Sequence, residues 1–204
     1  MDATRQNDLT LVPQLEATSD ALRGKPSLSM VGFLLVEMII GYEWLVSGVA
    51  KIVRGGFAAG LADELVEKSE KAPEWYGAFL KSFAIPYAEA FGYFIEIAEV
   101  LAGVALLVGP FIWLCRWDRV SDGVRKSVLL STAAAAIGGA ILAINLHLAN
   151  AGSHPWLIPN SGFDEGVDLD SILPAIQAVI AVVSIIFLVR LRRGSDRDDE
   201  KRGE

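Results

Sequence analysis

The sequence is poor in the residues that build covalent cross-links and metal centres. Cys115 is the only cysteine, and there are two histidines in 204 residues. One cysteine excludes an intrachain disulfide, a CxxC redox pair, a CxxCH haem-attachment motif and an iron–sulfur cluster built from this chain alone. No metal or haem is therefore expected, and any electrons that the protein handles need a bound molecule or a partner.

Residues 1–28 lack the short apolar core and the small-residue cleavage site of a secretory signal peptide, so we expect a flexible or surface-lying tail. There is also no excess of positive charge. The chain has 18 Lys and Arg against 25 Asp and Glu, a net charge of −7, and the charges gather in the tails and loops. Nucleic acid is not expected as a partner.

Long apolar segments dominate the rest of the chain. Apolar residues make up 52% of the sequence and charged residues 21%, and mean hydropathy is +0.41. Blocks of about 20 apolar residues are long enough to cross a bilayer. The sequence predicts an all-α, polytopic membrane protein with a four-helix transmembrane bundle over 29–190 and a charged tail over 191–204. The four predicted spans are 29–53, 86–109, 127–149 and 171–190.

The distribution of Lys and Arg predicts how the chain is oriented. Thirteen lie in the two tails and in the connection between the second and third spans, and five lie in or near the other two connections. The positive-inside rule then places both termini in the cytoplasm. We expect a multi-pass protein of the cell membrane, in contact with the lipid bilayer, with outer loops 54–85 and 150–170.

The first outer loop carries helical signals. Phe57, Leu61 and Leu65 recur at helical spacing beside charged residues, which predicts a short interfacial helix. Pro73 suits the first turn of a second short helix, and Pro86 can open the second span. The second outer loop is rich in turn-forming residues.

Ionisable residues inside the predicted spans are the unusual feature of the sequence. A charge at mid-membrane costs about 2.5 to 3.5 kcal/mol, whereas each Leu or Ile returns about 0.3 to 0.6 kcal/mol. Such side chains should face protein or water. The first two spans contain six of them: Glu37, Glu43, Lys51, Glu89, Glu96 and Glu99.

Helical spacing places these groups on faces that also carry small residues, so we expect them to surround one internal chamber open to the outside. Lys51, Glu89, His147 and Asn150 are expected in an outer layer about 5 Å deep, counted at 1.5 Å per residue. Lys51 would pair with Glu89 or bind an anion. Glu96 and Glu99 lie deeper, where we expect them to stay protonated or to exchange protons.

Structural interpretations remain open for several of these residues. Lys51 can extend to the membrane surface from near a helix end. Glu37 and Glu43 can be buried acids that bond neighbouring helices. Trp44 and Tyr93 can be packing or interfacial aromatics in place of a pair that stacks on quinone.

Two motifs resemble the DoxX family, including its DoxD branch. Gly41, Trp44, Gly48 and Lys51 fit the G-x-x-W/F…G-x-x-K pattern of that family's first helix. The second helix has the similar E-x-x-x-G-x-x-L-x-x-G pattern, which runs from Glu99 to Gly109. The resemblance covers about residues 30–110. It implies a four-helix bundle in which Lys51 and Glu99 are the carried-over polar positions, and the motif glycines are packing elements.

The DoxD resemblance implies the membrane subunit of a thiosulfate:quinone oxidoreductase, which oxidises thiosulfate to tetrathionate and reduces quinone. Quinone would be the acceptor, and a second small redox subunit would be required. Lys51, Arg54 and His147 would attract the anion, and the deep acids would exchange protons with quinone. The candidate catalytic residues are Lys51, Glu96, Glu99 and His147. The candidate substrate-binding residues are Trp44, Lys51, Arg54, Glu89, Tyr93 and Asn150.

Whether the chain is itself an enzyme is left open by the sequence. The main alternative is a noncatalytic anchor or assembly subunit of a redox complex, which would bind through its small-residue faces and outer helix. A small transporter is less favoured, because the sequence shows no discontinuous spans or inverted repeats. A homo-oligomer is a further alternative for the assembly.

Overall fold

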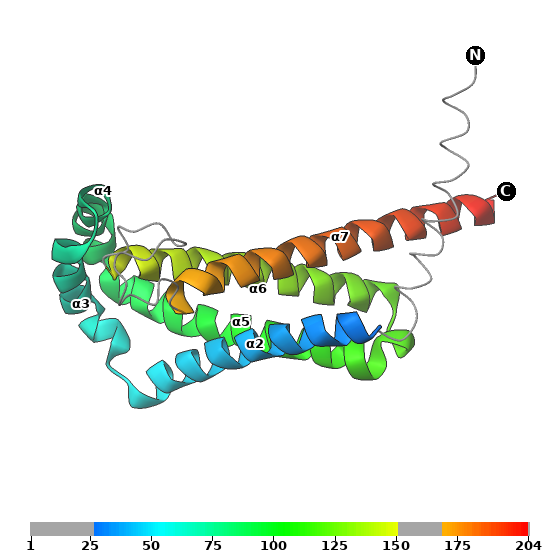
Figure 1. Ribbon diagram of the computed structural model, residues 1–204, viewed down its shortest axis with the longest axis horizontal. Coiled ribbons are helices and arrows are strands. Elements are labelled where there is room, and N and C mark those ends of the chain that lie inside the picture. Colours follow the sequence, from blue (N-terminus) through cyan, green and yellow to red (C-terminus); the bar gives the residue numbers. More distant parts are fainter. Residues whose placement is uncertain (1–26, 151–168, 204) are drawn as a thin grey trace, which may run out of the picture.

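The protein is an all-helical, multi-pass membrane protein, as the sequence predicts. The computed structural model describes residues 27–150 and 169–203, and no strand occurs among them (Figure 1). Four helices are long and apolar enough to cross a membrane. The predicted tail over 1–28 and the predicted loop over 150–170 fall mostly outside the described residues. The four long helices are α2 (Leu28–Arg54), α5 (Ala88–Arg116), α6 (Asp122–Ala149) and α7 (Leu169–Gly203).

The connection between α2 and α5 contains the helix predicted there and a second short one. These are α3 (Phe57–Lys71) and α4 (Glu74–Phe79). A π-helical turn and a 3-10 turn then lead into α5, and Pro86 lies in the 3-10 turn. Proline has no backbone N–H to donate, so irregular turns at this point are expected. The second span therefore does not begin at Pro86 but continues a bent helical segment that starts in α4.

Short polar residues and glycines set the helix ends. The Ser27 hydroxyl accepts a hydrogen bond from the Met30 backbone N–H at 3.3 Å, and Ser121 caps α6 in the same way through Val124. The chain leaves α2 through Gly55 and Gly56, whose φ angles are 67° and 80°. Side chains rarely tolerate this left-handed backbone, so the glycine pair allows the turn from α2 into α3.

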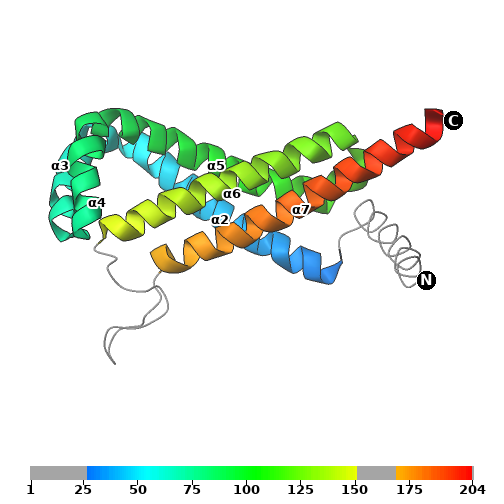
Figure 2. The ribbon, with the colours of Figure 1, turned by 90° about the horizontal axis from the view of Figure 1, so that it is seen from above.

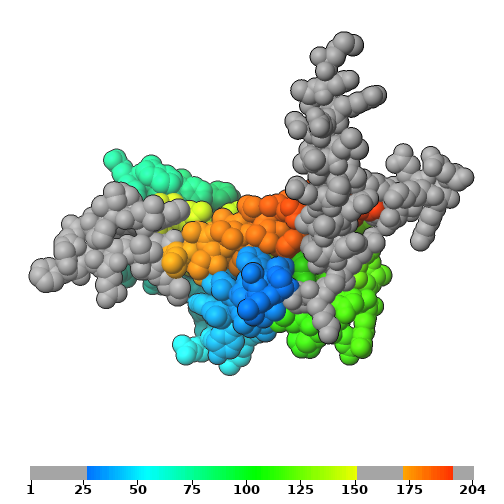
Figure 3. Space-filling view, turned by 45° about the vertical axis from the view of Figure 1, so that its right-hand side comes forward, coloured from blue at the N-terminus to red at the C-terminus, as the bar shows by residue number. Residues whose placement is uncertain are grey.

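The long helices pack as two pairs. α2 lies against α5 and α6 lies against α7, while α5 and α6 join the pairs (Figure 2). Helices α3 and α4 cross one end of the bundle, here called the α3–α4 end, and α7 extends past the opposite end (Figure 1). On one face α7 runs beside α2 (Figure 3). Large side chains fill that seam, where Leu34 meets Leu188 and Leu191, and Trp44 lies with Leu173 and Ile180.

The surface and the interior have the composition expected of helices in lipid. Outward-facing side chains on the spans are large and apolar, such as Ile39 and Phe94, which are 67% and 68% exposed. Inward-facing positions include glycines that bring helix backbones close together. Because lipid is as apolar as the bundle interior, close packing between small residues is a main source of helix association.

The turn between α5 and α6 is fixed by an aromatic and arginine cluster. The rings of Trp113 and Trp117 stack with centroids 4.0 Å apart. The buried Arg125 side chain donates two hydrogen bonds to the Trp117 carbonyl oxygen, at 3.1 and 2.8 Å, and pairs with Asp122 at 2.9 Å. Arg125 therefore bonds the carbonyl of the residue that follows α5 and ties this turn to the start of α6.

A buried amide in α7 gives a first testable prediction. Gln177 is fully buried, and its Nε2 and Oε1 atoms have no hydrogen-bond partner among the described residues. Each unpaired buried polar group costs about 1–3 kcal/mol. Gln177→Met keeps the length of the side chain and is expected to raise the apparent unfolding temperature in detergent, followed by tryptophan fluorescence. Gln177→Glu should lower it, and a lower value for Gln177→Met would show that the amide is bonded.

Candidate functional site

An ion pair between α2 and α5 is the most strongly bonded polar group in the spans. The Lys51 Nζ donates to both carboxylate oxygens of Glu99, at 2.7 and 2.6 Å. It also donates to the Ser47 hydroxyl at 2.7 Å, and the Phe57 ring centroid lies 5.2 Å from it. An ammonium group has three N–H donors, and three acceptor oxygens lie within hydrogen-bond distance of it here.

The packing of α2 on α5 brings these two residues together, although they are 48 positions apart. A Cβ atom at Gly48 would lie 2.9 Å from the Cβ of Glu99 and 2.8 Å from the backbone nitrogen of Val100. Gly48 therefore lets α5 approach at the level of Glu99. Ser47 precedes Gly48 on α2 and Lys51 follows it, each by less than one turn. Both side chains are therefore near the carboxylate.

The two partners differ in their access from outside. The Lys51 side chain is 24% exposed, whereas that of Glu99 is 2% exposed. The pair neutralises both charges, which suits a position within a span, where an isolated charge is costly. A ligand that approaches this site would reach the ammonium group before the carboxylate. The bonded acceptors of Lys51 would then compete with that ligand for its N–H groups.

The predicted pairing of Lys51 with Glu89 is wrong. The prediction starts the second span near Glu89 and so places this acid beside Lys51, whereas the structure places the start of α5 beside α3. A Cβ at Gly92 would lie 2.4 Å from the Cα of Ala58, so the first turns of α5 lie beside α3. Glu89 is exposed in that region. Glu99 rather than Glu89 is therefore the acid that lies beside Lys51. Glu96 is buried one turn before Glu99 on α5.

Among the residues that the structure describes, the six ionisable side chains of the first two spans do not surround the single chamber that the sequence predicts. Glu43 and Glu89 are exposed, whereas Glu37, Glu96 and Glu99 are buried. Of the six ionisable side chains in the first two spans, only Glu37 lines the cavity that the structure shows between the four long helices. Glu37 and Lys51 are 14 residues apart on α2, or about 21 Å along its axis. The buried acids thus occupy separate positions at different depths.

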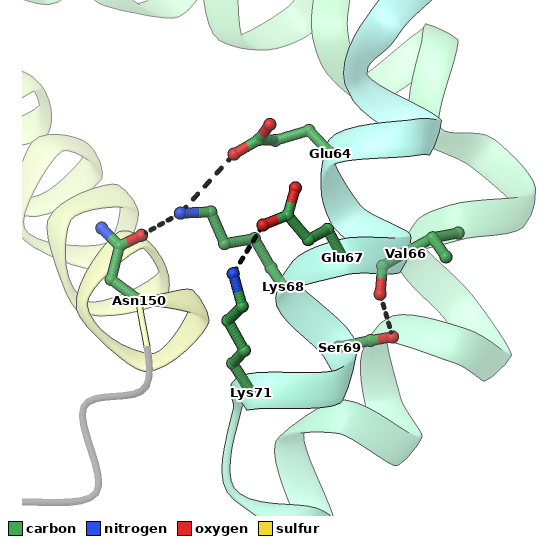
Figure 4. Close-up of polar contacts among 7 residues, drawn as sticks. All are labelled: Glu64, Val66, Glu67, Lys68, Ser69, Lys71 and Asn150. Atoms are coloured by element: carbon green, nitrogen blue, oxygen red, sulfur yellow. Dashed lines mark hydrogen bonds and ion pairs between the residues drawn. The ribbon is translucent and has the colours of Figure 1, made fainter.

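The other predicted polar residues lie near the end of α6. His147 is buried, and Asn150 is exposed and accepts a hydrogen bond from Lys68 of α3 at 2.6 Å (Figure 4). Lys68 also pairs with Glu64 at 3.5 Å. Asn150 therefore helps to hold α3 against α6, through a bond that comes from Lys68.

A second ion pair on α3 is fully exposed. Lys71 donates a hydrogen bond to Glu67 one turn earlier (Figure 4). This bond and the positive charge of Lys71 hold the pKa of the Glu67 carboxyl below its usual range. Water and salt screen such surface pairs, so Glu67 and Lys71 keep α3 polar on one side and stabilise it little.

The remaining candidate residues are spread over the bundle. Trp44 is buried in the cluster between α2, α5, α6 and α7, and its indole nitrogen has no hydrogen-bond partner among the described residues. Tyr93 is 54% exposed on α5, and Arg54 is exposed at the end of α2. Trp44 and Tyr93 therefore do not form an aromatic pair.

Several polar residues at helix contacts are not among the candidate site residues that the sequence predicts. Ser47 bonds Lys51, and its position one turn earlier on the same face could have indicated this. Thr132 donates to Glu37 at 3.4 Å. Gln177 and Ser184 are both buried and seven residues apart, which places them on one face of α7. That spacing marked the buried face of a span that otherwise reads as uniformly apolar.

Neither a search for metal-binding groups nor a comparison with known proteins assigns a function to the Lys51–Glu99 site. In residues 27–150 and 169–203, no group of three or more His, Cys, Asp or Glu side chains could hold a metal ion. No family model, no curated protein and no solved structure matches the chain. The resemblance to the DoxX family therefore depends on the sequence motifs alone.

Proposed function

We propose that this protein is a DoxX-like membrane subunit of a quinone-linked redox complex, with Lys51 and Glu99 as its polar site. The observation that carries the proposal is the ion pair itself. The resemblance selects these two residues from two separate motifs, and in the structure they bond each other across the α2–α5 contact. The motif glycines Gly41, Gly48 and Gly103 lie in the same contact.

The site suits exchange of protons with a ligand that has hydrogen-bonding oxygens. The partly exposed ammonium of Lys51 can donate to a quinone oxygen or to an oxyanion. Glu99 behind it can then take up or release the proton that keeps the pair neutral. Reduction of quinone to quinol consumes two electrons and two protons. The electrons would come from thiosulfate, two of which form one tetrathionate, through a second subunit.

The test is thiosulfate-dependent quinone reduction by the chain together with its partner subunit, in liposomes. Lys51→Met and Glu99→Gln are each expected to reduce the rate at least tenfold in assembled complex. Lys81→Met and Glu43→Gln are the matched controls, since both side chains are exposed and have no bond to the pair. Equal rates for the site variants and their controls would contradict a role of the pair in the reaction.

A noncatalytic anchor is the second candidate, and it is favoured by a specific observation. Three acceptor oxygens of the chain surround the Lys51 ammonium, and the α2–α5 packing around the pair is tight. An anchor would need the pair for stability alone. In that case Lys51→Met would lower the yield of assembled complex, while each assembled complex would reduce quinone at the normal rate.

A further inference from the structure

A small cavity lies between the four long helices, away from the Lys51–Glu99 pair. Its volume is about 10 Å³, and residues of α2, α5, α6 and α7 line it. A buried water molecule needs about 10–15 Å³ and two to four polar partners. The cavity is thus about the size of one water molecule. The lining residues with polar side-chain groups are Glu37, Thr132, Ser184 and Trp113, which has one indole N–H.

Glu37 is buried there without a counter-charge. It is 3% exposed, and the Thr132 hydroxyl donates to its Oε1 at 3.4 Å, which is a long hydrogen bond. Within the part of the chain that the structure describes, no Lys, Arg, His, Asp or Tyr from any of the four helices lines the cavity. An ionised carboxylate would be an isolated charge inside a span, which costs about 2.5–3.5 kcal/mol or more. A neutral carboxyl group avoids that cost.

A neutral carboxyl group has an O–H donor that needs an acceptor, and hydroxyl residues of the surrounding helices can supply one. Ser184 of α7 is 3% exposed and contributes a hydroxyl oxygen. Pro110 of α5 lines the cavity and cannot donate the N–H that would otherwise bond the Leu106 carbonyl. That carbonyl carbon would lie 2.9 Å from a Cβ at Gly41, one turn beyond Glu37 on α2. Ser184 on α7 is therefore an acceptor among the residues that line the cavity, and the Leu106 carbonyl of α5 is a further acceptor one turn away along α2.

Gly109 shapes the same place. A Cβ there would lie 2.7 Å from the Thr132 hydroxyl oxygen and 3.6 Å from the Glu37 Oε1. Glycine at this position therefore leaves room for the hydroxyl and the carboxyl to meet between α2, α5 and α6. The space is present because α5 has no side chain at Gly109.

We propose that Glu37, Thr132 and Ser184 form a proton-binding site that holds one water molecule. The Glu37 carboxyl carries the proton, the two hydroxyls orient the carboxyl and the water, and the water exchanges the proton with the carboxyl. The site is about 21 Å along α2 from Lys51, counted at 1.5 Å per residue, so it is independent of the proposed redox site. Its ligand is a proton, and a protonatable group at this depth can store or relay one within the span.

Infrared spectroscopy of the full chain in liposomes tests the proposal. At neutral pH we expect a carbonyl band of a neutral carboxylic acid that shifts in D₂O and is absent from Glu37→Gln. Glu43→Gln is the matched control, because Glu43 is an exposed acid on the same helix, and it should keep the band. Loss of a carboxylate band instead of the acid band in Glu37→Gln would overturn the proposal. A band that does not shift in D₂O would overturn it too.

A second set of measurements separates a proton site from other occupants, and it does not depend on the folding of Glu37→Gln. Thr132→Val and Ser184→Ala each remove one hydroxyl and should displace the acid band without removing it. A band that stays in place in both variants would overturn the assigned partners. Sodium titration at constant pH should leave the band unchanged. Conversion of the band to a carboxylate band by sodium would assign the cavity to a metal ion.

Discussion

Lys51→Met is expected to lower the free energy of unfolding by about 3–5 kcal/mol, because it leaves the buried Glu99 carboxylate without its cation. Glu99 is 2% exposed and bonds Lys51 through both oxygens. The cost comes mainly from an uncompensated charge inside a span, not from loss of the attraction between the two groups. The measurement is the midpoint of unfolding in mixed detergent micelles, followed by far-UV circular dichroism.

The two partners should not be equivalent in this measurement. Glu99→Gln leaves the ammonium of Lys51 with the Ser47 hydroxyl and with access to the outside, since its side chain is 24% exposed. We therefore expect a loss of about 1.5–3 kcal/mol, the range for a hydrogen bond to a charged group. The double variant Lys51→Met, Glu99→Gln should be more stable than Lys51→Met alone. Additive losses in that double-mutant cycle would contradict a direct interaction.

The sequence predicted the fold because the signals that set it are local. Four apolar blocks of the right length define four helices, and each block can be recognised without any knowledge of the packing. The register of α5 was not local. It depends on α3, because Ala58 of α3 packs against the first turns of α5. Helix α2 therefore meets α5 further along the chain, near Glu99.

The candidate site shows the same limit. Spacing on α2 correctly grouped Gly48 and Lys51, and spacing on α5 grouped Glu96 and Glu99, because one helix fixes each set. Pairing Lys51 with the right acid required the offset between two helices, which the sequence alone does not carry. The cavity at Glu37 was also missed, since it depends on Ser184 of α7, about 150 residues away in a span that was treated only as apolar.

Substitution of the glycines at the α2–α5 contact is the second large expected effect. Gly103→Ala would put a Cβ 2.5 Å from the backbone nitrogen of Leu45, and Gly48→Ala would put one 2.8 Å from that of Val100. Backbone atoms cannot move aside as a flexible side chain does, so the two helices would have to separate. We expect each substitution to lower the free energy of unfolding by about 3 kcal/mol, the upper end of the usual range for overpacking.

Gly32→Ala and Gly138→Ala are the matched controls, because a Cβ at either position meets no atom within 4 Å. Alanine favours a helix over glycine by about 1 kcal/mol, so these two variants should be unchanged or slightly more stable. The contrast separates close approach from helix propensity, since the same chemical change is made in all four variants. Separation of α2 from α5 would also lengthen the Lys51–Glu99 bonds. Gly48→Ala should therefore make the stability of the protein less sensitive to a further Lys51→Met change, and equal sensitivity would show that the glycine does not position the ion pair.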